Sequence, residues 1–191
     1  MHEANNDLGN EYIIGPLEQR HDRAAFSCES EPLNDYLKTF ARQNDSKRVS
    51  KVYVATRQGD KAICGFYTLS AHQVEIPRFP EDMQRKLPKY THLPALLLGR
   101  LARDSSHRGK GLGGLLLGDA IIMFVLTSSI VGAAALVVDA KDENAKKFYA
   151  ENGFLTFADN PMQLYMTFQK AKSYMPAGAM PTFSKEDIRW K

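Results

Sequence analysis

The sequence predicts an α/β protein of one domain, in which helices flank a mixed β-sheet. Two observations predict this class: β-rich segments come first along the chain, and a strand–helix–strand–helix–strand stretch follows from residue 96 onward. Antiparallel strands followed by alternating strands and helices indicate one sheet with both kinds of pairing. The length of 191 residues fits one domain, and 43% hydrophobic with 25% charged residues are ordinary values for a globular chain.

The first half of the chain is predicted to supply antiparallel strands and one amphipathic helix. The helix begins after Ser30, a capping-type residue that an early proline follows. Its apolar residues repeat at helical spacing: Leu33, Tyr36, Leu37, Phe40 and Ala41. The predicted strands of this half are residues 12–14, 52–56 and 62–69, of which the last two form a hairpin. Four prolines in residues 76–94 predict a loop, with a short helix near 82–86.

The second half alternates strands and helices. A glycine-rich turn, 105–114, separates the first strand from a long apolar helix, and Gly153 closes the second helix. The predicted elements are a strand at 96–102, a helix at 115–126, a strand at 133–138, a helix at 143–152, and strands at 154–157 and 162–168. We expect residues 1–170 to form the domain and residues 171–191 to form a C-terminal tail.

Composition narrows the location and the chemistry. Cys28 and Cys64 lie far apart without ligand-like spacing, which favours reduced thiols in a reducing compartment and no metal site. From its polar N-terminus we expect no secretory signal. The apolar stretch 115–135 is interrupted by Gly118 and Asp119, which favours a buried helix over a membrane span. We therefore expect a cytoplasmic protein, and the net charge of +3 by itself says little about nucleic acid.

The turn from Arg108 to Gly114 joins a strand to a helix and is suited to an anion. Glycines allow sharp turns and expose backbone N–H groups, and a helix N-terminus carries a partial positive charge. Arg108 and Lys110 add positive charge. A tight structural turn would also explain the glycines.

Three phosphate-binding interpretations of this turn compete. A nucleotide P-loop requires Ser or Thr after its lysine, but Gly111 follows Lys110. A dinucleotide fingerprint fits Gly109, Gly111 and Gly114, and Asp139 ends the next strand, but residues 103–107 separate the first glycine from its strand. The third pattern is the pyrophosphate loop Arg/Gln-x-x-Gly-x-Gly/Ala, which residues 108–113 match at every defined position.

A second motif covers residues 144–154. It reads as an asparagine, a small residue, Phe148-Tyr149 and then Gly153-Phe154. Taken alone, this segment is explained equally well by a purely structural amphipathic helix with a glycine cap and by a functional motif. Its place after the glycine-rich turn, one helix and one strand further along, favours a functional role.

Together the two motifs resemble those of the GNAT superfamily of N-acetyltransferases, a resemblance that implies a central, splayed sheet and acetyl-CoA as the cofactor. It also implies that Tyr149 is the catalytic acid beside the thioester sulfur. The residues that would bind the cofactor are Leu101, Ala102 and Arg103 along the central strand, Arg108, Gly109, Lys110, Gly111, Gly113 and Gly114 at the pyrophosphate, and Asn144 and Phe148 at the pantetheine arm.

The chemistry limits what the tyrosine can do. A phenol titrates near 10 and a thiol near 8.5, so full proton transfer to a free thiolate is uphill by about 2 kcal/mol. Hydrogen bonding to the sulfur, or transfer as the intermediate collapses, is therefore favoured. No glutamate stands out as a general base, which favours an α-amine, whose pKa is roughly 7.7–8.0. His72, Glu75 and water remain candidates.

Within that superfamily the chain most resembles the TacT-type toxin acetyltransferases. The supporting segments are 26–29, 33–37, 41–49, 65–70 and 93–102, together with the two motifs. The resemblance implies acetylation of the α-amine of aminoacyl-tRNA, which blocks translation, as well as a ribbon-helix-helix antitoxin and a homodimer. Arg103 departs from the small apolar residue that the family often has there.

Two other functions remain open: an enzyme that acetylates a small amine or a protein N-terminus, and a non-catalytic cofactor-binding module. Two basic clusters are candidates for contacts with tRNA phosphates. Solvated basic residues at a helix end explain each cluster about equally well. The candidates are Arg42, Lys47, Arg48 and Lys51 in the first cluster, and Arg85, Lys86 and Lys89 in the second.

Overall fold

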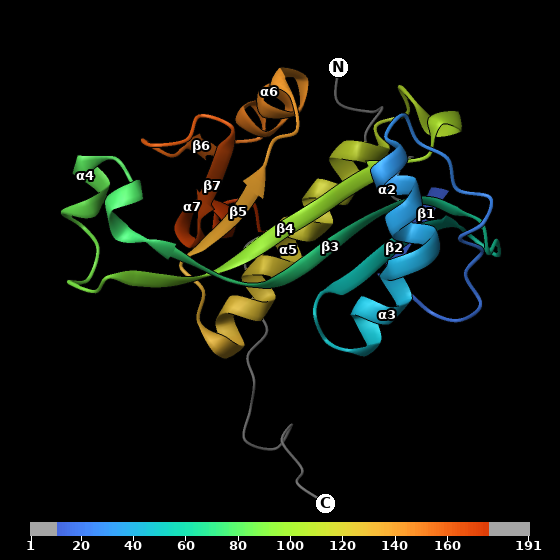
Figure 1. Ribbon diagram of the computed structural model, residues 1–191, viewed down its shortest axis with the longest axis horizontal. Coiled ribbons are helices and arrows are strands. Elements are labelled where there is room, and N and C mark those ends of the chain that lie inside the picture. Colours follow the sequence, from blue (N-terminus) through green and yellow to red (C-terminus); the bar gives the residue numbers. More distant parts are fainter. Residues whose placement is uncertain (1–10, 176–191) are drawn as a thin grey trace, which may run out of the picture.

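The computed structural model describes residues 11–175, which form a seven-stranded sheet with helices on both faces (Figure 1). The strand order is β1-β2-β3-β4-β5-β7-β6. Only β4 and β5 pair in parallel, and the other neighbours are antiparallel, so the expected mixed sheet is confirmed. The strands are β1 (Tyr12–Pro16), β2 (Lys51–Arg57), β3 (Ile63–Glu75), β4 (His92–Arg103), β5 (Ala135–Asp139), β6 (Leu155–Thr156) and β7 (Gln163–Thr167).

Helices cover the sheet by burying apolar side chains against it. The long helix α5 packs on β3, β4 and β5 in the largest core cluster, and Leu37 and Ala41 of the helical segment 31–46 pack against Val52, Val54 and Phe66 in a second one. The helices are α2 (Glu31–Asp35), α3 (Ala41–Ser46), α4 (Glu81–Gln84), α5 (Leu112–Val131), α6 (Glu143–Glu151) and α7 (Phe168–Lys172). The other helical segments are the π-helical η1 (Tyr36–Phe40), which joins α2 to α3, and the 3-10 turns η2 (Ile76–Arg78) and η3 (Ser105–His107).

The two central strands separate along their length. β4 pairs with β5 only from Ala95 to Leu98, although β4 continues to Arg103. At that point a bulge leaves Gly99 without a partner in β3, because Thr68 pairs with Arg100 and Leu69 with Leu98. A bulge bends its strand and increases the local twist. The end of β4 therefore leaves its neighbour and keeps the backbone edge of residues 99–103 free on the β5 side.

Helix α5 is long and apolar enough to span a membrane by length and composition alone. In the structure it lies against the sheet, with Leu112, Leu116 and Phe124 fully buried. Asp119, on the same helix, accepts a hydrogen bond of 2.5 Å from the buried hydroxyl of Tyr67. The helix thus occupies the place expected of a core helix.

Several element bounds differ from the sequence prediction. α5 begins at Leu112 and ends at Val131, so it is longer at both ends than predicted, because the apolar segment carries no clear stop before Gly132. α7 crosses the predicted domain end at residue 170, since Ala171 is fully buried against the core. The rest of the predicted tail, residues 176–191, lies outside the described residues.

Candidate active site

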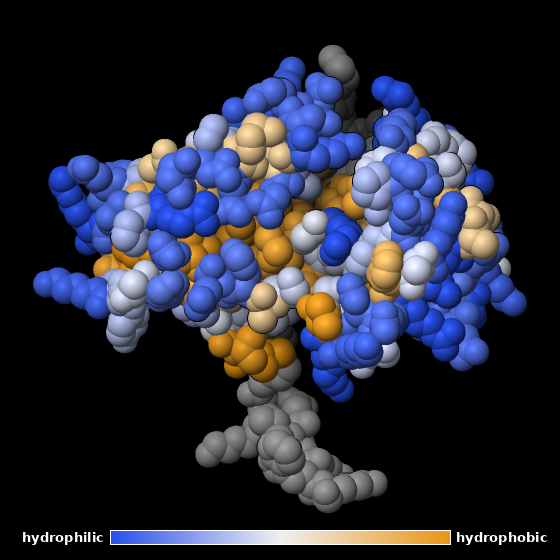
Figure 2. All heavy atoms as spheres, in the orientation of Figure 1, coloured by the Kyte–Doolittle hydropathy of each residue, from blue (hydrophilic) through white to orange (hydrophobic). Residues whose placement is uncertain are grey.

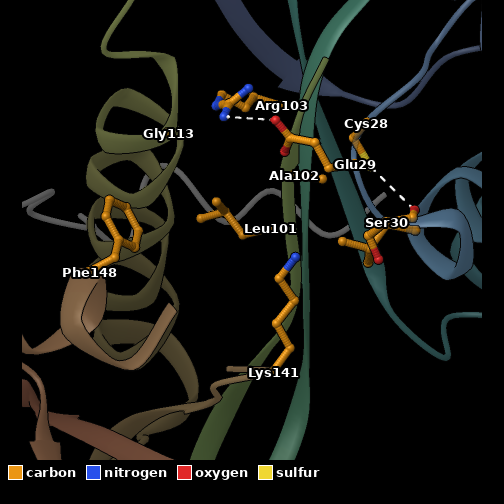
Figure 3. A pocket seen from close by; sticks show the side chains of 10 residues that line it. Cys28, Glu29, Ser30, Leu101, Ala102, Arg103, Gly113, Lys141 and Phe148 are labelled. Carbon is orange, nitrogen blue, oxygen red and sulfur yellow. Dashed lines mark hydrogen bonds and ion pairs between the residues drawn. The ribbon is translucent and has the colours of Figure 1, made fainter. Parts of the chain in front are cut away.

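A cleft opens where β4 and β5 separate. Two adjoining cavities of about 200 and 450 Å³ share the side chains of Glu29, Leu101, Lys141 and Phe148. Figure 3 shows Leu101 in the middle, with Phe148 of α6 on one side, Glu29 on the other and Lys141 below. The smaller cavity also contains Cys28, Ser30, Leu33, Ala102, Arg103 and Gly113, and the larger one Arg108, Asp142, Asn144, Ala145 and Tyr149.

The glycine-rich turn reaches the mouth of this cleft in the conformation its sequence predicts. Gly109 and Gly111 have φ of 75° and 74°, in the left-handed region that glycine tolerates best. Gly111 is the N-cap of α5, and the first amides of a helix have no acceptor within the helix. These amides, with the positive end of a helix of 20 residues, are available to an anion.

One buried contact and a set of hydrogen bonds to Asp104 fix this turn in place. The Tyr12 hydroxyl of β1 lies 2.7 Å from Nδ1 of His107, the residue before the turn. Asp104, at the end of β4, accepts hydrogen bonds from the amides of Ser27 and Ser106 and from the Ser106 hydroxyl. Partial burial alone would raise the pKa of the Asp104 carboxyl, but these hydrogen bonds outweigh it and hold the pKa below its usual value.

Tyr149 lies at the inner wall of the larger cavity. Its side chain is only 7% exposed and packs edge-on against Phe148 and beside Phe154. Burial, with a smaller contribution from the charge of Asp139, raises the pKa of Tyr149 to about 12. The phenol is therefore a hydrogen-bond donor at any physiological pH.

Charged groups face one another across the cleft. One carboxylate oxygen of Glu29 lies 3.3 Å from Nη1 of Arg108 and 3.5 Å from Nη2 of Arg103. The other terminal nitrogen of Arg103, Nη1, is buried without a hydrogen-bond partner. A buried donor without a partner is costly, so this atom marks a place where a ligand acceptor fits.

The structure brings most of the predicted cofactor residues to this cleft. Leu101, Ala102, Arg103, Arg108, Gly113, Asn144, Phe148 and Tyr149 all line it. Gly109, Lys110, Gly111 and Gly114 line neither cavity and belong to the adjoining turn and first turn of α5. Among residues 11–175, no group of three or more His, Cys, Asp or Glu side chains is arranged to hold a metal ion.

The basic clusters lie elsewhere and apart from each other. Arg42, Lys47, Arg48 and Lys51 are exposed on and after α3, and Arg85, Lys86 and Lys89 are exposed after α4. Figure 1 places α3 and α4 at opposite ends of the sheet, so one chain does not join the two clusters into one patch. Lys51 is also partly neutralised, because its Nζ lies 3.1 Å from a carboxylate oxygen of Asp45.

Sequence reasoning missed Glu29 and Lys141, which the fold brings to the cleft from outside both motifs. Segment 26–29 supports the family resemblance, but nothing in its pattern assigns a role to its glutamate. The two base candidates His72 and Glu75 lie instead toward the far end of β3, opposite Ala95 and His92, away from Leu101. Glu75 there lies 3.7 Å from His92, an exposed pair without access to the cleft.

The cleft fits the acetylated cofactor that the motifs imply. A diphosphate matches the amides and cations of the turn, an extended arm matches the free edge of β4, and a thioester would then reach the buried phenol. A splayed mixed sheet that presents these three features together is the architecture of an acetyl-CoA-dependent N-acetyltransferase of the GNAT superfamily.

Comparison with known proteins narrows this class. No family model matches the chain. A tRNA-acetylating toxin of Mycobacterium tuberculosis is 32% identical over 152 residues, which cover 80% of this chain and 89% of that protein. A probable toxin TacT of Sinorhizobium fredii is 29% identical over 171 residues, 85% of this chain and 94% of the relative. The chain belongs to the TacT-type family of toxin acetyltransferases.

Solved structures agree with this assignment. A tyrosine-to-phenylalanine mutant of KacT superimposes with a TM-score of 0.82 at 29% identity, over 86% of this chain and 99% of that one. AtaT complexed with acetyl-methionyl-tRNA superimposes with a TM-score of 0.80 at 28% identity, over 85% of this chain and 98% of that one. A mutant AtaT bound to acetyl-CoA and to the C-terminus of the antitoxin AtaR superimposes with a TM-score of 0.72 at 26% identity, over 85% of this chain and 97% of that one.

Proposed function

We propose that this protein is a toxin that transfers the acetyl group of acetyl-CoA to the α-amine of aminoacyl-tRNA. An N-acetylated aminoacyl group has no free amine to enter a peptide bond, so translation stops. The observation that carries the proposal is the cleft itself, in which the free edge of β4 and the buried Tyr149 meet a cavity open to a bulky acceptor. The tRNA-acetylating relative supports the choice of acceptor.

Different residues of the cleft have different roles in this acetyl transfer. Acetyl-CoA supplies the activated acetyl thioester. The turn from Arg108 to Gly114 binds the diphosphate through amides and cations, and the free edge of β4 aligns the pantetheine arm. We expect a backbone N–H in the segment from Leu101 to Arg103 to stabilise the developing oxyanion. The hydroxyl of Tyr149 donates a hydrogen bond to the sulfur as the carbon–sulfur bond breaks.

The basic clusters are our candidates for the tRNA backbone. Exposed lysines and arginines outside the cleft suit phosphate contacts, which orient a nucleic acid without reading its sequence. The cluster on α3 adjoins a groove of about 620 Å³ that Arg48 and Lys51 line. Because the clusters lie at opposite ends of one sheet, a tRNA that contacts both must span the molecule or bridge two copies of it.

We further propose a homodimer, a ribbon-helix-helix antitoxin and a cytoplasmic location, where charged tRNA is found. An apolar patch supports a protein partner: Val49, Ile130 and Val131 are 61%, 65% and 70% exposed, and Val49 and Val131 line the same groove. Figure 2 shows apolar atoms gathered below the sheet, where the C-terminal end of α5 lies in Figure 1. Such a patch is typical of an interface. Sedimentation velocity should give twice the monomer mass for wild type. The substitution Val131→Asp should lower the observed mass toward that of the monomer.

The experiment that tests the function is incubation of the pure protein with labelled acetyl-CoA and total aminoacyl-tRNA. We expect label on the α-amine of the aminoacyl group, released with it by mild base. Induction in cells should arrest growth, and Tyr149→Phe should abolish the arrest. Label on a small amine or a protein N-terminus, with charged tRNA left unlabelled, would contradict the proposal. Cofactor binding with no transfer to any amine would favour a non-catalytic module.

A further inference from the structure

The cleft contains a carboxylate to which neither motif gives a role. Glu29 lines both cavities, together with Leu101 and Phe148, and in the larger one it faces the same space as Tyr149. Asp142 also lines that cavity, but its side chain caps α6 by accepting a hydrogen bond from the amide of Ala145. The side chain of Glu29, in contrast, does not cap a helix.

The backbone on the N-terminal side of Glu29 is held in place by hydrogen bonds to Asp104, Ser105 and the buried Asn34. The Ser27 amide donates to Asp104, and the Ser27 carbonyl accepts from the Ser105 amide, both at 2.8 Å. Next to it, the amide and carbonyl of Cys28 are both bonded to the buried side chain of Asn34, at 2.8 and 3.1 Å. Four hydrogen bonds therefore fix an otherwise irregular segment so that its glutamate is directed at the cleft.

We propose that Glu29 is the catalytic group that takes the proton from the acceptor amine, opposite Tyr149 on the sulfur side. This assignment rests on the proposed acetyl transfer. In that step the amine nitrogen bonds to the acetyl carbon, and the carbon–sulfur bond breaks. The N–H proton passes to a carboxylate oxygen of Glu29, while the thiolate that leaves is hydrogen-bonded by Tyr149 and later protonated.

A carboxylate is much less basic than an α-amine, but the order of steps in acetyl transfer still allows it to accept the amine's proton. A carboxylate is far too weak to deprotonate a free α-ammonium group, because the reference pKa values are about 4.3 and 7.7–8.0. The amine attacks in its neutral form, however, and its nitrogen becomes positively charged only as the new bond forms. As the carbon–sulfur bond then breaks, the nitrogen becomes that of an N-protonated amide and is strongly acidic, so that transfer of its proton to a nearby carboxylate is favourable.

The arginine partners of Glu29 link this role to cofactor binding. The pyrophosphate residue Arg108 and the neighbouring Arg103 both contact one oxygen of Glu29, at 3.3 and 3.5 Å (Figure 3 shows the contact with Arg103). A bound diphosphate competes for Arg108 with more negative charge than one carboxylate has. Cofactor binding thus releases Glu29 toward the acceptor, which favours an order in which acetyl-CoA binds first.

The test compares Glu29→Gln with Glu18→Gln in the full-length protein. Glu18 is an exposed glutamate that pairs with Arg20 at 2.8 Å outside the cleft. At saturating acetyl-CoA, we expect Glu29→Gln to lower kcat by about 10²- to 10⁴-fold. In calorimetry it should bind CoA about twofold to fivefold more tightly than wild type, because an exposed ion pair no longer competes for Arg108. Glu18→Gln should match wild type in both measurements.

A second variant separates chemistry from structure. Glu29→Ala should recover part of its turnover when formate is added, whereas Tyr149→Phe should not respond. Wild-type kcat in Glu29→Gln, or no response of Glu29→Ala to formate, would overturn the proposal. So would a fall in CoA affinity of Glu29→Gln together with a lower melting temperature, which indicates a structural role.

The acceptor distinguishes this proposal from the proposed function. The same variants are assayed with total aminoacyl-tRNA and with methionine amide, a minimal α-amine. If wild type acetylates methionine amide but not charged tRNA, the toxin function fails and the comparison at Glu29 still stands on the small acceptor. If wild type acetylates charged tRNA and Glu29→Gln does so equally well, only the role of Glu29 fails.

Discussion

At the scale of single residues, we propose that Tyr149 is the catalytic side chain on the sulfur side, because burial keeps its phenol protonated. Burial raises its pKa to about 12, whereas a free thiol titrates near 8.5. Full transfer of its proton to a thiolate at equilibrium therefore costs about 5 kcal/mol, more than the reference values suggest. We therefore propose that the phenol acts by hydrogen bonding to the sulfur as charge develops there, and that water reprotonates the thiolate afterwards.

Replacement of Tyr149 by phenylalanine tests this role. The change removes one hydroxyl and keeps the ring that packs against Phe148 and Phe154. We expect turnover to fall by about 10²- to 10⁴-fold, because the developing thiolate loses its donor. The affinity for CoA should stay within a factor of about two of wild type. Thiol release measures the first quantity and calorimetry the second, and unchanged turnover would remove Tyr149 from the mechanism.

The same burial predicts a dependence of stability on alkaline pH. The unfolded phenol loses its proton near pH 10, but the folded one keeps it up to about pH 12. This contribution to stability is fully present below pH 10 and is lost as the pH rises through 12. When the pH is raised from 8 to 11, the free energy of unfolding, measured with urea, should fall in both proteins. The fall should be about 1 kcal/mol smaller in Tyr149→Phe than in wild type. An identical loss in both proteins would show that the folded phenol titrates normally.

At the scale of elements, the junction of β4 and α5 positions the cofactor loop. Asp104, the residue after β4, accepts a hydrogen bond from the Ser27 amide, and His107 contacts Tyr12 of β1. α5 can lie close to β3 because Gly65 has no side chain: a Cβ there would meet Leu116 Cδ1 at 2.7 Å. The helix N-terminus is thereby held over the edge of the sheet where the strands separate.

Gly109→Ala tests the loop conformation. At φ of 75° a Cβ is strained by about 1–2 kcal/mol, although the space around it is open. We expect CoA affinity to fall by about 5- to 30-fold, since the loop must distort to relieve this strain.

Gly118→Ala is the matched control, in the interior of α5, where an added Cβ also meets nothing within 4 Å. It should raise stability by about 0.5–1 kcal/mol and leave CoA affinity unchanged. Equal CoA binding by both variants in calorimetry would show that the left-handed glycine is not needed for the diphosphate site.

For the whole molecule, the sheet separates the chemistry from the surfaces that would hold a large acceptor. The cleft lies at the centre, between β4 and β5, and the two basic clusters lie at either end (Figure 1). Interactions with phosphates at such a distance contribute affinity without touching the reacting atoms. Their removal should therefore weaken tRNA binding and leave the cofactor site intact.

Substitution of the first basic cluster tests this separation. Arg42→Ala combined with Lys47→Ala should weaken tRNA binding and lower the slope of log affinity against log salt by about one for each phosphate that the protein no longer neutralises. Lys61→Ala, an exposed lysine on the β2–β3 turn, is the control and should match wild type. Filter binding at several salt concentrations measures the slope. A slope unchanged in the double variant would place the tRNA elsewhere.

Features that depend on neighbours along the chain could be predicted from the sequence alone. The turn from Arg108 to Gly114 and the motif from Asn144 to Phe154 are such features, because local backbone geometry and helical spacing follow from adjacent residues. The order of strands and helices could be predicted for the same reason, and the mixed sheet that it implies is confirmed. Element ends follow less directly from the sequence, as the extra length of α5 shows.

Which distant groups meet at the cleft depends instead on how the whole chain packs. Ser27 and Asp104 are 77 residues apart, and their hydrogen bond brings Glu29 beside Arg108. The bulge at Gly99 and the packing of α5 then open the sheet so that Lys141 and Tyr149 face that carboxylate across one cavity. No spacing along the sequence encodes such contacts, because they form only when separate core clusters pack and fix the segments relative to one another.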